Sequence, residues 1–214
     1  METRIISTDD GEGRLEVRTN GLPEASIFPK DARPGRELVA QWLTVLPAAA
    51  RPGLRNMLVV GLGGGLALER VPASVESIDV VELEPEVLRA NQRFAAWRDR
   101  DPLADPRLRV RLADARSALL LSEERYDAIV SQPSHPWGAG ASHLYTREFF
   151  LLARDRLAID GVFVQWIGLG FVDRTLGATF GVARGLLVVV VFALIAGVTA
   201  LPKRDWWQNS TLGL

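Results

Sequence analysis

Four glycines follow a run of leucine and valine residues in the segment 58–65, and they are the strongest sign of chemistry in the sequence. A glycine turn after a buried strand lets a ligand approach the backbone closely. About twenty residues later a second apolar run ends in Glu82, whose carboxylate can accept hydrogen bonds from both hydroxyls of a ribose. The sequence therefore predicts a site for a nucleoside-containing ligand, with Gly61, Gly63 and Gly65 in the turn.

The spacing of these glycines argues against a dinucleotide. The dinucleotide pattern G-x-G-x-x-G needs a small third residue at position 66, where this chain has Leu66. The alternative interpretation, a tight strand-to-helix connection without a ligand, is weakened because Glu82 follows at the expected distance. The turn therefore favours an adenosine-containing ligand other than NAD.

Further polar residues follow the later apolar runs. Asp114 comes after residues 108–112, where it can accept a hydrogen bond from the amine of an adenine or cap the next helix, and both interpretations stay open. Gln132 and His135 follow residues 127–131, so we expect them above the same site. His135 can act as a base near neutral pH, and its alternative role is that of a surface histidine. Tyr145 lines the pocket or packs beneath this loop.

Composition excludes several classes of protein and site. The chain of 214 residues has no cysteine, and His143 lacks partners at metal-like spacing, so we predict no metal site. A net charge of −1 gives no electrostatic reason to expect a nucleic-acid partner. The N-terminus does not resemble a signal peptide, so the sequence predicts a cytoplasmic location for the main domain.

The order of patterns predicts an α/β fold. Strands are expected at 56–60, 78–83, 108–112, 127–131 and 161–166, alternating with helices at 66–71, from Pro85, at 115–121 and at 146–157. Such alternation predicts a mostly parallel sheet with helices on both faces, and its ligands bind beyond the carboxyl ends of the strands. We expect three parts: a β-hairpin and a helix in 1–50, with the helix ending near Pro47, a nucleoside-binding domain in 51–175 and an apolar segment in 176–214.

The apolar segment leaves two interpretations open. Residues 185–201 carry no charge, and Lys203, Arg204 and Trp206 follow, a pattern typical of a membrane span near the lower limit of length. Four consecutive valines in the same run favour a buried late strand instead. Membrane contact through 185–201 is therefore one expectation, and a soluble core element is the other.

Taken in order, the motifs GLGGG, VELEP, ADAR, IVSQPSHPWGAG, LYTREFF and GVFVQW resemble the spermidine synthase (polyamine aminopropyltransferase) family. The resemblance covers about residues 14–170 and is closest to the family's divergent, often membrane-fused branch. It implies a class I methyltransferase-like (Rossmann-like) fold that commonly dimerises. It also implies transfer of an aminopropyl group from decarboxylated S-adenosylmethionine to an amine. By position, Glu82 would hold the ribose, Asp114 the adenine, and Tyr145 and Gln165 would line the substrate pocket.

Three positions depart from the family's pattern. The acid usually found within the glycine turn is replaced by Gly64, and the two aspartates usually found after the fourth strand are replaced by Gln132 and His135. An amine is cationic at neutral pH and must lose a proton before it attacks, a step that carboxylates assist and glutamine cannot. The resemblance therefore implies that the nucleoside half of the site is retained and the amine half is altered.

Three functions follow from these observations. The first is an aminopropyltransferase-like protein that binds decarboxylated S-adenosylmethionine, with weak, altered or absent transfer. The second is an S-adenosylmethionine-dependent methyltransferase, which needs no strong base if its acceptor is already nucleophilic. The third is a non-catalytic nucleoside-binding or membrane-tethered module.

Overall fold

A computed structural model describes residues 3–7, 15–19, 22–28, 30, 39–133 and 141–167 of the 214-residue chain. These residues all lie within one compact unit, Met1–Gly168. The predicted base His135 and the apolar run 185–201 lie outside the described residues. Among the residues that are described, no helix is long and apolar enough to cross a membrane.

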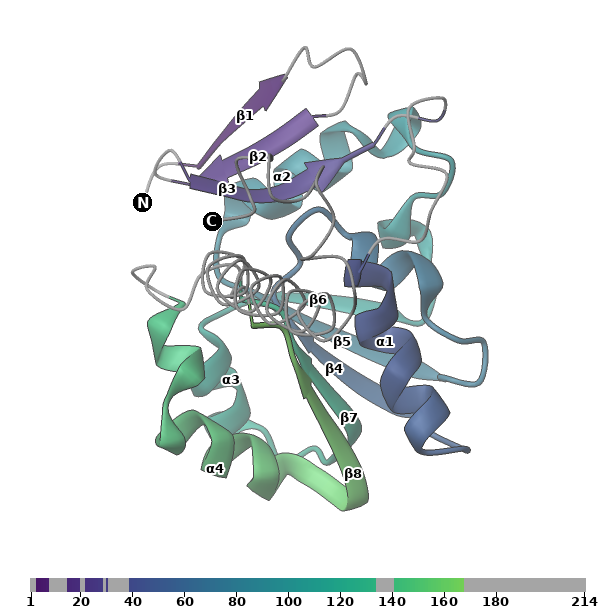
Figure 1. The fold of residues 1–214 in the computed structure, drawn as a ribbon, viewed down its shortest axis with the longest axis vertical. Helices are drawn as coiled ribbons and strands as arrows, with labels where there is room; N and C mark the ends of the chain where they lie inside the picture. Colours follow the sequence, from purple (N-terminus) through teal and green to yellow (C-terminus); the bar gives the residue numbers. More distant parts are fainter. Residues whose placement is uncertain are drawn as a thin grey trace, which may run out of the picture. The chain divides into compact units, whose positions relative to one another are not determined.

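A five-stranded sheet forms the centre of this unit (Figure 1). Its order is β6 (Leu108–Leu112), β5 (Ser77–Glu82), β4 (Asn56–Val60), β7 (Tyr126–Ser131) and β8 (Leu157–Gln165). Every neighbouring pair in the sheet is parallel. The predicted parallel sheet is confirmed. Because the strands are parallel, the loops after β4, β5 and β7 all lie at the carboxyl ends of the strands, on one side of the sheet.

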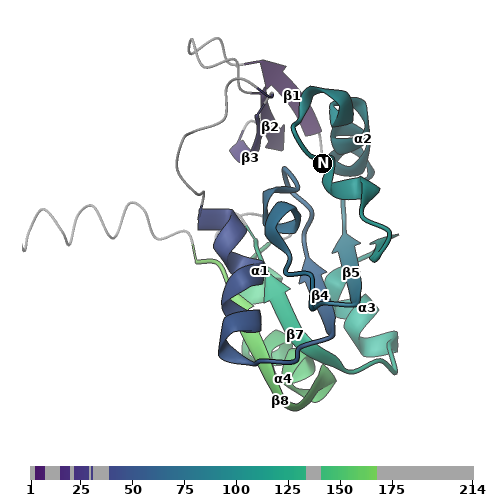
Figure 2. The same cartoon turned by 90° about the vertical axis from the view of Figure 1, so that its right-hand side faces the viewer.

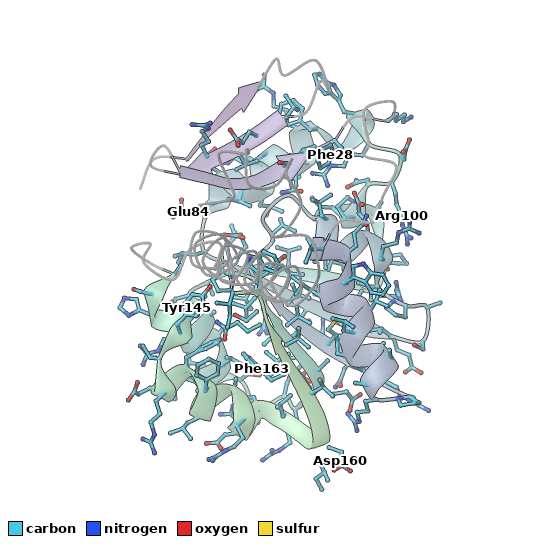
Figure 3. All side chains as sticks on the ribbon, viewed as in Figure 1. Phe28, Glu84, Arg100, Tyr145, Asp160 and Phe163 are labelled. Carbon is cyan, nitrogen blue, oxygen red and sulfur yellow. The ribbon has the colours of Figure 1, made fainter. Side chains whose placement is uncertain are left out.

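Helices cover both faces of the sheet, as predicted (Figure 2). On one face lie α1 (Val39–Ala50), the 3₁₀ helix η2 (Leu66–Arg70) and α2 (Pro85–Arg93). The other face carries α3 (Ala115–Leu121) and α4 (Arg147–Arg156). In Figure 3, Phe163 of β8 lies on the α4 side of the sheet, where its ring packs against those of Phe149 and Phe150. Short 3₁₀ turns complete the connections: η3 (Ala95–Trp97), η4 (Pro102–Ala104) and η5 (Ser142–Tyr145).

The N-terminal part forms a separate antiparallel sheet. The predicted hairpin is present as β2 (Leu15–Thr19) and β3 (Leu22–Ile27), and β1 (Thr3–Ser7) adds a third strand. Leu15, Val17 and Ile27 form a small apolar cluster, against which Phe94 packs from the segment after α2. The hairpin thus contacts the segment that follows α2.

Helix α1 differs from the sequence prediction in two ways. It continues through Pro47 to Ala50 instead of ending near the proline. Its apolar residues Trp42 and Leu46 are about half exposed, whereas the polar residues Gln41 and Thr44 are buried.

The buried polar side chains of α1 hold η2 in place. Gln41 Nε2 donates to Glu69 Oε2 at 3.0 Å, and Thr44 Oγ1 donates to the carbonyl oxygen of Ala67 at 2.6 Å. Because η2 follows directly after the glycine turn, α1 contributes to positioning that turn through hydrogen bonds as well as through apolar packing.

Candidate nucleoside site

The turn between β4 and η2 has a backbone that requires glycine. Gly61, Gly63 and Gly65 have φ values of 90°, 52° and 75°, in the left-handed region that side chains with a Cβ disfavour. The N–H of Gly61 donates to the carbonyl of Val81 at 2.8 Å, which ties the start of the turn to β5. Alternating glycines therefore build the tight turn that the sequence predicts.

Glu82 is bonded to this turn directly. Its Oε2 accepts from the backbone N–H of Leu62 at 2.7 Å, and its Oε1 accepts from that of Glu84 at 2.8 Å. The side chain is only 7% exposed. Burial raises the pKa of the Glu82 carboxyl, and hydrogen bonds from backbone N–H groups oppose that rise. The backbone N–H groups of Leu62, Gly63, Leu83 and Glu84 all act to lower this pKa, so donors of the turn and of the residues after β5 surround the carboxylate.

Two residues that the sequence predictions missed support the turn from the side of α2. Asn91 is fully buried, and its Nδ2 donates to the carbonyl oxygen of Gly63 at 2.8 Å. The Asn91 Oδ1 accepts from Arg98 Nη2 at 2.8 Å. The sequence held one signal: Asn91 stands four residues after Val87, on the buried face of an amphipathic helix.

Asp114 caps α3. Its Oδ1 accepts from the backbone N–H of Ser117 at 2.9 Å and from the Ser117 hydroxyl at 3.0 Å. The capping interpretation is confirmed, and contact with an adenine stays a prediction that the second oxygen, Oδ2, leaves open. The position suits that role, because Asp114 follows β6, the strand next to β5 in the sheet.

Gln132 donates a hydrogen bond to the glycine turn. Its backbone N–H donates to Val60 O at 3.1 Å, and its side-chain Nε2 donates to the carbonyl oxygen of Gly61. A carboxylate at this position has no hydrogen to donate and would face that carbonyl oxygen unfavourably. The amide therefore bridges the ends of β4 and β7, a role that an aspartate cannot perform.

Tyr145 and Gln165 lie near the carboxyl ends of β7 and β8. The Tyr145 hydroxyl lies 3.0 Å from the carbonyl oxygen of Pro133 and 3.2 Å from that of Trp166, and burial raises its pKa. Gln165 Nε2 donates to Leu144 O at 2.9 Å. The structure thus brings the two predicted pocket residues close to the loop that begins at Gln132.

Ser131 is a further polar residue at this end of the sheet. It pairs in register with Gln165, so the two side chains share the face of the sheet that α3 and α4 cover. Within the described part of the chain, the buried Ser131 Oγ and Gln165 Oε1 have no hydrogen-bond partner. Both residues stand at the carboxyl ends of their strands, β7 and β8.

Asp127 is the acid nearest in sequence to the loop after β7, but its contacts lie at the opposite end of the sheet. Asp127 accepts from the backbone N–H groups of Arg55 and Asn56 at 2.9 and 3.2 Å, and it pairs with Arg51. Burial alone would raise the pKa of Asp127, but these hydrogen bonds outweigh it, and the net shift is downward. Asp127 therefore anchors the segment between the end of α1 and the start of β4, and it does not serve the loop after β7. Among the described residues no cluster of three metal-ligating side chains occurs.

A parallel sheet with a glycine turn after β4 and a buried acid at the end of β5 is the arrangement of a class I methyltransferase-like (Rossmann-like) fold. The family model for the spermine/spermidine synthase domain matches residues 37–168, well over half of the chain. The chain therefore belongs to the spermine/spermidine synthase family.

Individual relatives agree with this assignment. The polyamine aminopropyltransferase 1 of Streptomyces coelicolor is 38% identical over 126 residues, which are 56% of this chain and 24% of that protein. The polyamine aminopropyltransferase of Buchnera aphidicola is 26% identical over 136 residues, covering 63% of this chain and 47% of its own. The chain thus spans between a quarter and a half of the length of these two relatives.

Solved structures support the fold. A spermidine synthase crystallised with the transition-state analogue AdoDATO aligns with a TM-score of 0.65 and 22% identity. The alignment covers 76% of this chain and 53% of that one. A second family model, that of the Colicin V production protein, matches residues 156–213, most of which lie outside the described residues.

Proposed function

We propose that this chain binds an S-adenosyl-type nucleoside, decarboxylated S-adenosylmethionine or a close relative, on the turn between β4 and η2. The observation that carries the proposal is the hydrogen bond between Glu82 Oε2 and the N–H of Leu62. It joins the acid that would hold the ribose to the glycine turn that would approach the rest of the ligand. The family relationship supports the same class of ligand.

We further propose that aminopropyl transfer by this chain is weak, altered or absent. Gln132 is engaged with Gly61, and Asp127 is engaged at the other end of the sheet. Gln132 and Asp127 are therefore unable to take a proton from an acceptor amine that binds beside the loop after β7. Loss of a general base typically lowers a rate by about 10²–10⁴-fold.

A thermal-shift panel tests the nucleoside proposal. We expect methylthioadenosine and at least one of the two S-adenosyl ligands to raise the melting temperature, and NAD to leave it unchanged. At about a hundredfold excess over Kd, one bound ligand stabilises a chain of this size by about 5–10 °C. If none of the adenosyl ligands raises the melting temperature, the chain is better explained as a module that binds no nucleoside.

Restoring the carboxylates tests the account of the amine half. We expect the double variant Gln132→Asp, His135→Asp to raise aminopropyl transfer to putrescine by about 10²-fold or more over the wild type, because it supplies groups that attract and deprotonate an amine. The assay is mass-spectrometric detection of spermidine and methylthioadenosine. Gln132→Asn is the matched control, since it keeps an amide and should gain nothing. Equal product from all three proteins, or none from any, would contradict this account.

A methyltransferase is the second candidate function. The observation that favours it is the same engagement of Gln132 and Asp127, because methyl transfer to an acceptor that is already nucleophilic needs no strong base. The acceptor would lie near Ser131 and Gln165, whose buried oxygens lack partners in the described residues.

A further inference from the structure

A buried cation lies behind the glycine turn. The Arg98 side chain is 5% exposed, and within the described residues its Nε and Nη1 have no hydrogen-bond partner. A Cβ placed on Gly65 would lie 2.9 Å from Nη1, so the guanidinium reaches the backbone of the turn. Burial lowers the pKa of Arg98, while the charges of Glu69 and Asp101 oppose that shift. A guanidinium nevertheless stays cationic in proteins.

Asn91 connects this cation to one peptide of the turn. Its Nδ2 donates to the carbonyl oxygens of both Gly63 and Val87 at 2.8 Å, and its Oδ1 accepts from Arg98, so its orientation is fixed. In a trans peptide the carbonyl and the following N–H point in opposite directions. Since the Gly63 carbonyl faces Asn91, the N–H of Gly64 faces away from α2. A chain of hydrogen bonds that begins at a cation polarises this peptide with its positive end at that N–H.

Most N–H groups of the turn donate within the protein: that of Gly61 to Val81 O, that of Leu62 to Glu82 and that of Gly65 to Leu62 O. A ligand at the turn would therefore meet the polarised N–H of Gly64. Residues 61–66 are glycines and leucines only, and three of the glycines have left-handed φ values. A backbone N–H polarised in this way is a donor suited to an anion. A ligand ammonium group gains nothing from N–H donors or from a nearby guanidinium, whereas a carboxylate accepts from the first and is attracted by the second.

We propose that this turn selects S-adenosyl ligands that retain the α-carboxylate of methionine over ligands that have lost it. S-adenosylmethionine then binds more tightly than its decarboxylated form, which presents only positive charge to the turn. The proposal rests on the proposed nucleoside site, because it requires the ligand to lie on this turn. Asn91 and Arg98 act as positioning residues, through the Gly63–Gly64 peptide.

Calorimetric titration of the full chain with three ligands tests the proposal. Methylthioadenosine lacks both the amine and the carboxylate and therefore reports on the nucleoside site alone. We expect S-adenosylmethionine to bind roughly ten- to a hundredfold more tightly than decarboxylated S-adenosylmethionine, the range of one charge-assisted hydrogen bond. Binding of methylthioadenosine with a preference for the decarboxylated ligand would overturn this proposal alone. Failure of all three to bind would overturn the proposed function as well.

Two variants locate the source of the preference. Arg98→Met should lower the ratio of the two affinities by roughly tenfold, beyond any loss of methylthioadenosine binding, a pattern that general loosening of the fold does not produce. Arg89→Met on the exposed side of α2 is its control, because that side chain is 69% exposed. Gly64→Asp should invert the preference, since Gly64 is not among the glycines with positive φ and an aspartate can adopt its backbone. An unchanged ratio in Gly64→Asp would overturn the proposal even if Arg98→Met does not fold.

Discussion

Glu82→Gln is expected to lower the affinity for methylthioadenosine by about a hundredfold or more. The carboxylate would provide charge-assisted hydrogen bonds to the ribose, each worth about 1.5–3 kcal/mol. The same oxygens also accept from Leu62 and Glu84, and an amide has only one oxygen for these two donors. The variant therefore loses ligand contacts and disturbs the turn. Isothermal titration calorimetry measures the change.

Glu86→Gln is the matched control for this experiment. Glu86 lies four residues further on, at the exposed start of α2, where it pairs with Arg89. Exposed pairs contribute about 0–1 kcal/mol, so nucleoside affinity should stay within a few-fold of the wild type. Unchanged affinity in Glu82→Gln, or an equal loss in both variants, would contradict the assignment of Glu82 to the ribose.

Gly65→Ala is expected to lower the free energy of unfolding by about 2–5 kcal/mol. Alanine at a left-handed φ costs about 1–2 kcal/mol, and overpacking costs a further 1–3 kcal/mol or so. The new Cβ would lie 2.7 Å from Pro102 Cγ and 2.9 Å from both Arg98 Nη1 and Asn91 Oδ1. Because Asn91 and Arg98 support the turn, nucleoside binding should fall as well. Urea denaturation gives the stability.

Gly53→Ala separates the two causes of that loss. Gly53 also has a left-handed φ, 87°, but a Cβ there meets nothing within 4 Å in the part of the chain that the structure describes. It should therefore lose only the conformational part, about 1–2 kcal/mol. If the two variants lose equal stability, the crowding of Gly65 against Pro102, Asn91 and Arg98 is not what makes glycine necessary there.

Local sequence patterns were sufficient for most strands of the parallel sheet and for the glycine turn. The predicted strands at 56–60 and 108–112 coincide with β4 and β6. The first is an apolar run, the second alternates apolar residues with arginine, and turn-forming residues bound both. At β8 the prediction began too late, at residue 161 in place of Leu157. Asp160 there takes a φ of 62°, and Gly161 next to it admits the carbonyl oxygen of Ala158, which would lie 2.9 Å from a Cβ. Strand β8 therefore runs through an irregular stretch of backbone at Asp160 and Gly161, which the sequence pattern does not reveal.

Periodicity could not predict what depends on distant partners. Gln41 and Thr44 are buried in α1 only because Glu69 and Ala67 accept their hydrogen bonds, more than twenty residues away in the sequence. The same holds for the site. The position of Gln132 after a strand predicts that it lies above the ligand site, but its bond to Gly61 depends on the pairing of β4 with β7, which no local pattern shows. Nothing near Arg98 in the sequence indicates that its side chain is buried against the turn.

A crystal structure of the wild-type chain with methylthioadenosine would show where the nucleoside binds. We expect it on the glycine turn, with ribose hydroxyls about 2.5–3.0 Å from the Glu82 carboxylate oxygens. We also expect Gln132 to keep its bond to Gly61. A nucleoside bound elsewhere, or bound on the turn with Glu82 out of reach of the ribose, would contradict the account.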